Sequence, residues 1–347
     1  MLNSNGLDIQ RDVQLADLST MGVKAISKYF ATLDDINLLP EIINFVESTH
    51  SRFLILGGGS NVLFVGDFDG LIIKNELNGI QIVEETETQV LLKIGAGENW
   101  HALVEFCVGN RWFGIENLAL IPGTVGAAPI QNIGAYGVEL VDVFVELEAF
   151  DIDNKTFNVF NKRDCKFGYR DSIFKNTLKN KFIITSVTIR LQKNGEVNFG
   201  YSALKSHFET LGISTPSIDE IFKAVVEVRQ SKLPDPAFIG NNGSFFKNPV
   251  IPVFHYDELK QKYPDIPSYP VTEQLVKVPA GWLIDKAGWK GYRKGDAGVH
   301  AKQALVLVNY GYASGQDIYQ LSEMVLNDVI QKFGIKLERE VNIFGGN

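Results

Sequence analysis

The chain reads Arg52-Phe53-Leu54-Ile55-Leu56-Gly57-Gly58-Gly59-Ser60-Asn61 near its amino-terminal end. The apolar run predicts a strand over 52–56, and the glycines predict a loop directly after it. A strand followed by a glycine-rich loop suits phosphate binding, because bare backbone N–H groups can approach the anion closely. The spacing is neither Gly-x-Gly-x-x-Gly, since Val62 takes the last glycine position, nor a Walker A loop. On its own this loop is equally consistent with a plain tight turn.

A second glycine-rich stretch occupies residues 121–137 and is the densest group of small residues in the chain. It holds four glycines, three alanines and two prolines in 17 positions, which excludes an ordinary helix or strand. The stretch also holds Ile121, Val125, Ile130 and Ile133, and disordered segments avoid such apolar content. A loop that contacts a ligand is therefore favoured over a flexible connection.

Helices and strands are predicted outward from these two loops. Periodicity and capping residues predict helices over 34–49, from Trp100 after the N-cap Asn99, over 218–232 behind the capping box Ser217/Glu220, and from Ser314 to Gly334. Apolar and β-branched runs predict strands over 71–73, 80–83, 90–95, near 139–150, 156–160, 182–192 and 304–308, with an alternating strand over 335–343. A domain boundary is predicted near Gly195.

Three further segments combine polar groups in unusual settings. Asn241 to Pro249 places Ser244 between a glycine and two phenylalanines, a poor core strand but a good way to hold a hydroxyl beside an anion. Arg170 follows Tyr169 in a glycine-containing turn, where a surface ion pair is the simpler interpretation of that turn alone. Glu340 lies on the polar face of the last strand, where solvation is the default.

Composition excludes several classes of protein. The 347 residues suggest two or three domains, and a net charge of −8 argues against a nucleic-acid-binding surface. Two cysteines indicate free thiols in a reducing cytosol, and the five histidines show no zinc-ligand spacing, so no metal is expected. No apolar stretch reaches the ~20 residues of a membrane helix, and no signal peptide is recognised.

The motifs together resemble the UDP-N-acetylenolpyruvoylglucosamine reductase (MurB) family, in the order that this family shows them. They are Gly-Gly-Gly-Ser-Asn at 57–61, Pro-Gly-Thr-Val-Gly to Gly-Ala-Tyr-Gly at 122–137, Tyr-Arg-Asp-Ser-Ile-Phe-Lys at 169–175, Lys-Leu-Pro-Asp-Pro at 232–236, Gly-Ser-Phe-Phe-Lys-Asn-Pro at 243–249 and Leu-Glu-Arg-Glu-Val at 337–341. The resemblance covers nearly the whole chain.

The resemblance implies an α+β fold with a split FAD-binding domain of the vanillyl-alcohol-oxidase (PCMH) type at 20–195. A C-terminal α+β substrate-binding domain would follow at 196–347. The implied enzyme is cytoplasmic and monomeric, binds neither nucleic acid nor membrane, and uses FAD and NADPH. It reduces UDP-N-acetylglucosamine enolpyruvate to UDP-N-acetylmuramate for peptidoglycan synthesis.

The resemblance also implies roles for particular residues. Arg170 would stabilise the developing enolate, Glu340 would orient Arg170 or donate a proton, and Ser244 would be the proton donor. The implied cofactor-binding residues are Gly57, Gly58, Gly59, Ser60, Asn61, Gly123, Thr124, Gly126 and Tyr136. The implied substrate-binding residues are Tyr169, Tyr201, Lys232, Asn248, Lys290 and Gln303. The tyrosine loop at Tyr201 favours the first subtype of the family.

Two alternatives remain at this point. Another flavoprotein of the same fold, acting on an alcohol or a sugar, would share the two glycine-rich loops but would not need Ser244 or Glu340. A non-catalytic nucleotide-sugar-binding protein would keep the fold without a use for all three catalytic residues.

Overall fold

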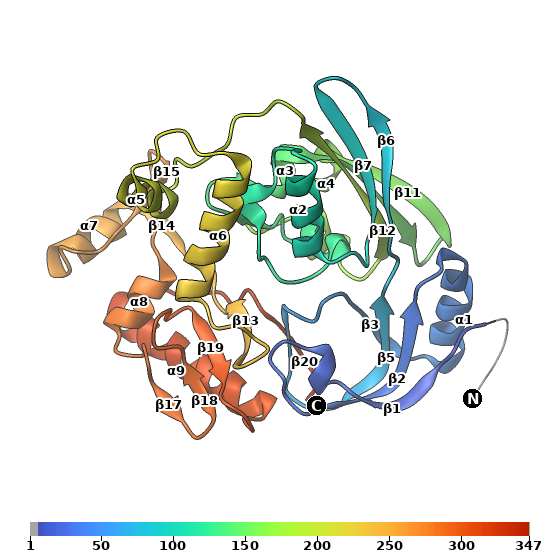
Figure 1. Cartoon of the computed structure of the whole chain (residues 1–347). Coiled ribbons are helices and arrows are strands. Elements are labelled where there is room, and N and C mark those ends of the chain that lie inside the picture. The colour runs from blue at the N-terminus through green and yellow to red at the C-terminus, as the bar shows by residue number, and fades with distance from the viewer. Residues whose placement is uncertain (1–5, 347) are drawn as a thin grey trace. The chain divides into compact units, whose positions relative to one another are not determined.

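The computed structural model describes residues 6–346, which divide into two compact units (Figure 1). The first unit holds the chain up to Val13, Ser27–Gly58 and Asp69–Ser231. The second holds Gln14–Ile26, Gly59–Phe68 and the chain from Lys232 onward. The chain therefore passes from one unit to the other within the glycine-rich loop at 57–61.

The first unit contains two sheets. One has the strand order β1–β2–β5–β3, with β1 Gln10–Gln14, β2 Ile26–Leu33, β5 Phe68–Asn75 and β3 Arg52–Leu56. The helix α1 (Leu39–Thr49) buries Leu39, Ile42 and Ile43 in a core that also contains Leu71 and Ile73 of β5. Since β3 and β5 pair in parallel, Leu56 lies opposite Lys74 where the glycine-rich loop begins.

The second sheet of this unit is antiparallel, with the order β11–β10–β12–β7–β6. Its strands are β11 Thr156–Asn161, β10 Phe144–Asp151, β12 Phe182–Gln192, β7 Gln89–Gly95 and β6 Ile80–Glu85, the last two forming a long hairpin (Figure 1). The helices α2 (Trp100–Gly109), α5 (Ser202–Leu211) and α6 (Ile218–Lys232) contribute to its core. The remaining strands and α-helices are short: β8 Gly134–Ala135, β9 Val138–Glu139, α3 Leu140–Val143 and α4 Lys162–Cys165. Short 3-10 helices occupy Ile36–Leu38, Glu116–Leu118, Val125–Ile130 and Ile173–Lys175.

The second unit is also built from sheets and helices. One sheet has the order β13–β19–β18–β17, with β13 Gly240–Ser244, β19 Val306–Asn309, β18 Ala297–Val299 and β17 Arg293–Lys294. Another has the order β14–β16–β15, with β14 Val250–Pro252, β16 Leu275–Lys277 and β15 Tyr269–Thr272. The helices are α7 Val253–Lys262, α8 Ala280–Lys286 and α9 Gly315–Phe333, and β20 (Asn342–Phe344) pairs in parallel with β4 (Val62–Phe64).

Most elements agree with the sequence predictions, and their ends follow from local chemistry. The Asn99 side chain accepts the Ala102 N–H at 3.0 Å, and Ser217 and Glu220 cap α6 reciprocally. The helix α9 begins after Ser314 and ends at Gly334, whose φ of 66° is the left-handed conformation that glycine adopts readily. The mixed architecture agrees with the α+β class.

Two predicted strands differ from the structure. The strand predicted near 139–150 begins only at Phe144, because Glu139 and Asp142 cap a helical turn over 140–143. The strand predicted over 335–343 is regular only from Asn342, although Ile335, Leu337 and Val341 are buried as expected. Residues 338–340 instead pair with the segment after Ser244.

The compact units also differ from a division near Gly195. The helices α5 and α6 follow that point but place Leu204, Phe208, Ile221 and Val225 in the core of the first unit. The domain division at residues 195/196 stays a prediction.

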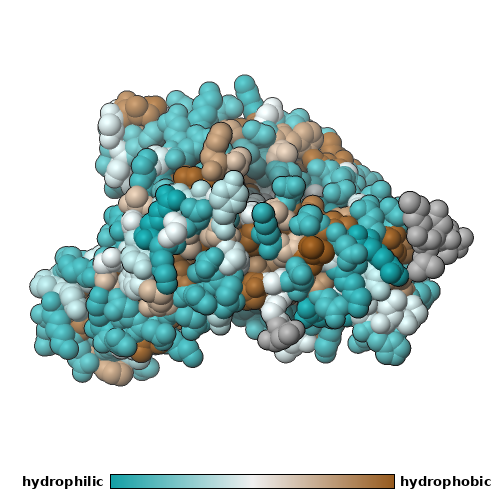
Figure 2. All heavy atoms as spheres, turned by 90° about the horizontal axis from the view of Figure 1, so that it is seen from below, coloured by the Kyte–Doolittle hydropathy of each residue, from teal (hydrophilic) through white to brown (hydrophobic). Residues whose placement is uncertain are grey.

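The surface and the side-chain clusters bear on whether the protein crosses a membrane or holds a metal ion. Figure 2 shows a face on which hydrophilic residues predominate and hydrophobic residues occur in small groups. Across residues 6–346, no helix is long and apolar enough to cross a membrane. Over the same residues, no cluster of three or more His, Cys, Asp or Glu side chains is arranged to hold a metal ion.

Candidate active site

Two glycine-rich loops press against each other in the first unit. A Cβ atom added at Gly58 would lie 2.7 Å from Gly123 Cα, and one at Gly57 would lie 2.4 Å from Thr124 Oγ1. The second loop is held by backbone bonds from the N–H groups of Trp100 to Gly123 and of Gly126 to Ala96. These contacts require bare backbone, so the sequence pattern reflects close packing of the two loops.

Thr124 shows where a polar ligand would fit this pair of loops. Its hydroxyl oxygen is buried and has no hydrogen-bond partner in the structure. Buried hydroxyls are nearly always bonded, so an orphaned one beside a glycine-lined backbone suits a bound group with polar atoms.

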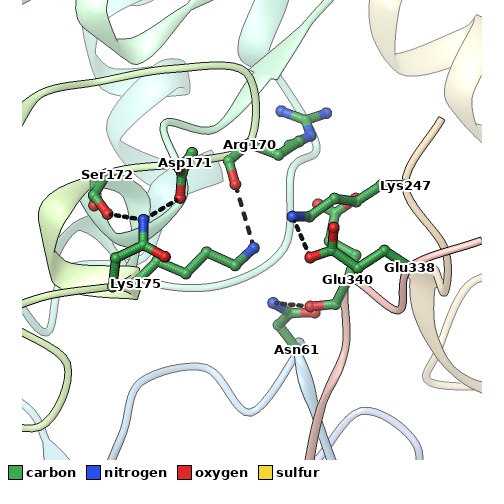
Figure 3. A network of polar contacts seen from close by, with 9 residues as sticks. Asn61, Arg170, Asp171, Ser172, Lys175, Lys247, Glu338 and Glu340 are labelled. Carbon is green, nitrogen blue, oxygen red and sulfur yellow. Dashed lines mark hydrogen bonds and ion pairs between the residues drawn. The ribbon is translucent and has the colours of Figure 1, made fainter. Parts of the chain in front are cut away.

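Arg170 has its guanidinium fixed on the loop after Gly168. Its Nη2 donates to the Gly134 carbonyl at 2.7 Å. Its own carbonyl accepts from Lys175 Nζ at 3.2 Å (Figure 3). The Tyr169 ring centroid lies 5.8 Å from Arg170 Cζ. The backbone φ of Arg170 is 53°, a left-handed conformation that is uncommon away from glycine and recurs at functional sites.

Two predicted tyrosines of the first unit meet directly. The rings of Tyr136 and Tyr201 pack edge to face, with centroids 5.5 Å apart. Burial raises the pKa of Tyr136, and nearby Arg229 partly opposes that rise. Tyr201 immediately precedes α5 and keeps 43% of its surface exposed. The structure thus brings together one residue predicted to bind the cofactor and one predicted to bind the substrate.

In the second unit, Ser244 and Glu340 belong to neighbouring backbone segments. Ser244 ends β13 opposite Val306, and its side chain is exposed while Phe245 and Phe246 are buried. The Glu340 N–H donates to the Phe245 carbonyl at 2.9 Å. A serine hydroxyl is therefore held at a fixed position beside the segment that carries the glutamate.

Asn61 and Lys247 tie this arrangement together. Asn61 Nδ2 donates to the Glu340 carbonyl at 3.3 Å (Figure 3). The Asn61 carbonyl accepts from the Asn342 N–H at 3.1 Å. Lys247 forms an ion pair with Glu338 at 2.6 Å, and its N–H donates to the Glu338 carbonyl. Asn61, predicted to bind the cofactor, therefore fixes the backbone at Glu340.

Three of the four predicted substrate residues of the second unit have structural partners. Asn248 Oδ1 accepts the Ala280 N–H at 2.9 Å, which satisfies the first turn of α8. Lys290 pairs with Asp285 at 2.9 Å. Gln303 Oε1 accepts the Leu305 N–H at 3.5 Å, and Lys232 is exposed. None of these contacts tests whether the side chains bind substrate.

Known families match both halves of the chain. Residues 235–344 match the family "UDP-N-acetylenolpyruvoylglucosamine reductase, C-terminal domain". Residues 27–159 match the family "FAD binding domain". The UDP-N-acetylenolpyruvoylglucosamine reductase of Amoebophilus asiaticus is 47% identical to this chain, over 97% of it and 99% of that protein. The chain belongs to the UDP-N-acetylenolpyruvoylglucosamine reductase family.

Further relatives agree with this assignment. The reductase of Flavobacterium johnsoniae is 45% identical over 97% of this chain and all of that protein. The solved structure of the Thermus caldophilus reductase, at 23% identity, aligns with a TM-score of 0.66 over 97% of this chain and 99% of that chain. This last likeness confirms the fold.

Membership of the reductase family makes the protein an FAD-dependent oxidoreductase. The residues present fit FAD, because the glycine-lined contact of Gly57 and Gly58 with 123–124 leaves bare backbone beside an orphaned hydroxyl. A diphosphate is the part of FAD that such a backbone would hold.

Sequence reasoning missed Arg229, which lies on α6 one residue after the buried Val228. Its Nε is fully enclosed and has no hydrogen-bond partner, and within residues 6–346 no carboxylate lies within 4.0 Å of its guanidinium. Burial lowers its pKa, Tyr136 opposes this, and Arg170 lowers it further. Arg229 stands four residues after the inward Val225, so an arginine on the apolar face of the predicted helix was the available signal.

Proposed function

We propose that this enzyme reduces the vinyl ether of UDP-N-acetylglucosamine enolpyruvate to the lactyl ether of UDP-N-acetylmuramate, with NADPH as hydride source. The observation that supports this most is 47% identity over nearly the full length, with Arg170, Ser244 and Glu340 all present in their motifs. When bound, FAD supplies hydride transfer between NADPH and the terminal carbon of the enolpyruvyl group.

Arg170 stabilises the charge that develops on the substrate. Addition of hydride to the terminal carbon leaves negative charge on the adjacent carbon, which spreads into the carboxylate as an enolate. A guanidinium stays charged and can fork onto a carboxylate, and bonds to Gly134 and from Lys175 hold this loop before substrate arrives.

Ser244 then donates a proton to the enolate carbon, which completes reduction of the double bond. Serine is a weak acid, so a neighbour or a water must stabilise the alkoxide or return its proton. Glu340 orients the guanidinium or, when protonated, donates to the enolate oxygen. The backbone bond from the Glu340 N–H to the Phe245 carbonyl fixes the segment that carries Glu340 next to the segment that carries Ser244.

Arg229 is a second arginine of the first unit that we assign to binding an anion. A partly buried guanidinium with an enclosed, unbonded Nε and no carboxylate partner is costly, and a bound anion would reduce that cost. The anionic groups in this reaction are the substrate carboxylate, the reduced cofactor and the diphosphates, and Arg229 binds one of these.

The remaining predicted residues bind the nucleotide and the sugar. Tyr201 covers the nucleotide, Lys232 and Lys290 neutralise phosphate charge, and Asn248, Gln303 and Tyr169 provide polar and aromatic contacts. The Ala280 N–H donates to Asn248 Oδ1, which helps to fix the position of this side chain. The enzyme works as a monomer in the cytoplasm.

The test is an anaerobic visible spectrum of the purified protein, with NADPH added first and the enolpyruvyl sugar second. A flavin band that bleaches and then returns establishes both half-reactions. A band that bleaches but does not return refutes this substrate and favours an oxidoreductase of the same fold that acts on an alcohol or a sugar.

A further inference from the structure

Lys74 lies beside the first glycine-rich loop, although no motif pointed to it. It is the penultimate residue of β5, between the buried residues Ile73 and Asn75, and it pairs with Leu56 at the end of β3. Its Nζ donates to the Gly57 carbonyl at 2.5 Å. The ammonium group therefore sits directly at the first residue of the loop.

The charge of Lys74 is not balanced locally. The side chain is partly buried, and burial lowers its pKa while Glu76 opposes that effect. In the described part of the chain, no carboxylate oxygen lies within 4.0 Å of Lys74 Nζ, and its hydrogen bond goes to a neutral carbonyl. A partly buried cation without a counter-ion is unfavourable unless an anion binds nearby.

The surroundings of Gly57 suit an anion. Gly57 and Gly58 pack against Thr124 and Gly123 so closely that no Cβ would fit, and the Thr124 hydroxyl has no partner. A carbonyl oxygen in such a loop would repel a phosphate, but here the Gly57 oxygen is already bonded to an ammonium group. Lys74 thus engages the Gly57 carbonyl oxygen, which would otherwise repel a phosphate, and adds positive charge at the same place.

We propose that Lys74 binds and positions the diphosphate of FAD, both by its charge and by fixing the Gly57 carbonyl. This assigns to the cofactor site a residue from the sheet beneath the loop. The assignment rests on FAD as the cofactor and not on which substrate the enzyme reduces.

The experiment compares Lys74→Met, Lys74→Gln and Lys74→Arg in the full chain. After removal of the flavin, binding of FAD and of riboflavin, which has no phosphate, is measured by flavin fluorescence at low and high salt. Lys74→Met should weaken FAD binding roughly 10- to 100-fold, the loss expected for one charge-assisted hydrogen bond. Its riboflavin binding should be unchanged, and its FAD affinity should depend less on salt.

The other variants separate charge from loop shape. Lys74→Gln keeps a donor for the Gly57 carbonyl without the charge, so it should still lose FAD affinity, whereas Lys74→Arg should largely restore it. Lys28→Met is the control, because Lys28 lies on the adjacent strand β2 in an exposed ion pair with Asp69 at 2.8 Å. It should bind both flavins normally.

Two results would overturn the proposal. One is an equal loss of FAD and riboflavin affinity in folded Lys74→Met, which would make Lys74 a residue of loop shape only. The other is normal FAD affinity in Lys74→Gln, which also answers the question if the methionine variant does not fold.

Discussion

Ser244 is a residue whose substitution should separate the two halves of the reaction. The Ser244→Ala variant removes the hydroxyl at the exposed end of β13 and leaves the buried Phe245 and Phe246 in place. Loss of a positioned proton donor costs about 10²- to 10⁴-fold in rate. We expect flavin reduction by NADPH at the normal rate and reoxidation by the enolpyruvyl sugar slowed by that factor, in stopped-flow spectra. The exposed Ser214→Ala is the matched control, and near-normal turnover of Ser244→Ala would exclude this role.

Arg229 offers a second test, because a charge without a counter-ion should destabilise the protein when no ligand is bound. Replacing the unpaired guanidinium in Arg229→Met should leave the melting temperature of the flavin-free protein unchanged or higher. Binding of FAD or of the enolpyruvyl sugar should weaken about tenfold or more. Thermal melts and ligand titrations measure both, with the exposed Arg190→Met as control. Lower stability with unchanged affinities would show that Arg229 is structural.

Among the structural elements, the contact between the two glycine-rich loops is the most sensitive to added volume. In Gly58→Ala the new methyl group would meet Gly123 Cα at 2.7 Å, which is backbone and cannot rotate away. We expect a loss of about 1–3 kcal/mol in stability from such overpacking, together with release of FAD during purification. Gly109→Ala at the end of α2 has no atom within 4 Å of the added group. That control should be neutral or slightly stabilising, and flavin content with denaturant melts would distinguish the two variants.

The elements also show what the sequence can and cannot predict. Capping boxes such as Ser217/Glu220 and Ser314/Asp317 act within one turn, so the starts of α6 and α9 were predictable. The pairing of Glu340 with Phe245 joins residues far apart in the chain, which local sequence patterns do not reveal. Lys74 lies in an ordinary strand pattern, and the helix pattern around Arg229 does not show what its guanidinium contacts. Their importance follows from missing partners, which requires the folded structure.

For the whole molecule, the two compact units are not consecutive in the sequence. Gln14–Ile26 and Gly59–Phe68 join the second unit, while α5 and α6 join the first. The helices α5 and α6 belong to the first unit because their inward residues, for example Phe208 and Val225, pack in the core of the antiparallel sheet. Changes in composition along the chain indicate linkers between consecutive domains. They could not predict a unit that is assembled from three separate segments.

Two buried thiols make the stability of the whole protein depend on pH. Cys107 and Cys165 both lie in that core, and burial raises the pKa of each thiol to about 12. The unfolded chain loses these protons near a pKa of about 8.5, whereas the folded protein retains them. Stability should therefore be unaffected by the thiols below about pH 8.5 and should fall as pH rises toward 12.

Melting temperatures across this alkaline range would measure the effect. Each thiol should contribute a slope of up to about 1.4 kcal/mol per pH unit, because the folded state binds one more proton than the unfolded state. The Cys107→Ala and Cys165→Ala variants should each remove one such contribution, and thiol reagents should label the native protein only on unfolding. Rapid labelling of the native protein near neutral pH, or identical pH profiles in the alanine variants, would show that burial of these thiols does not control alkaline stability.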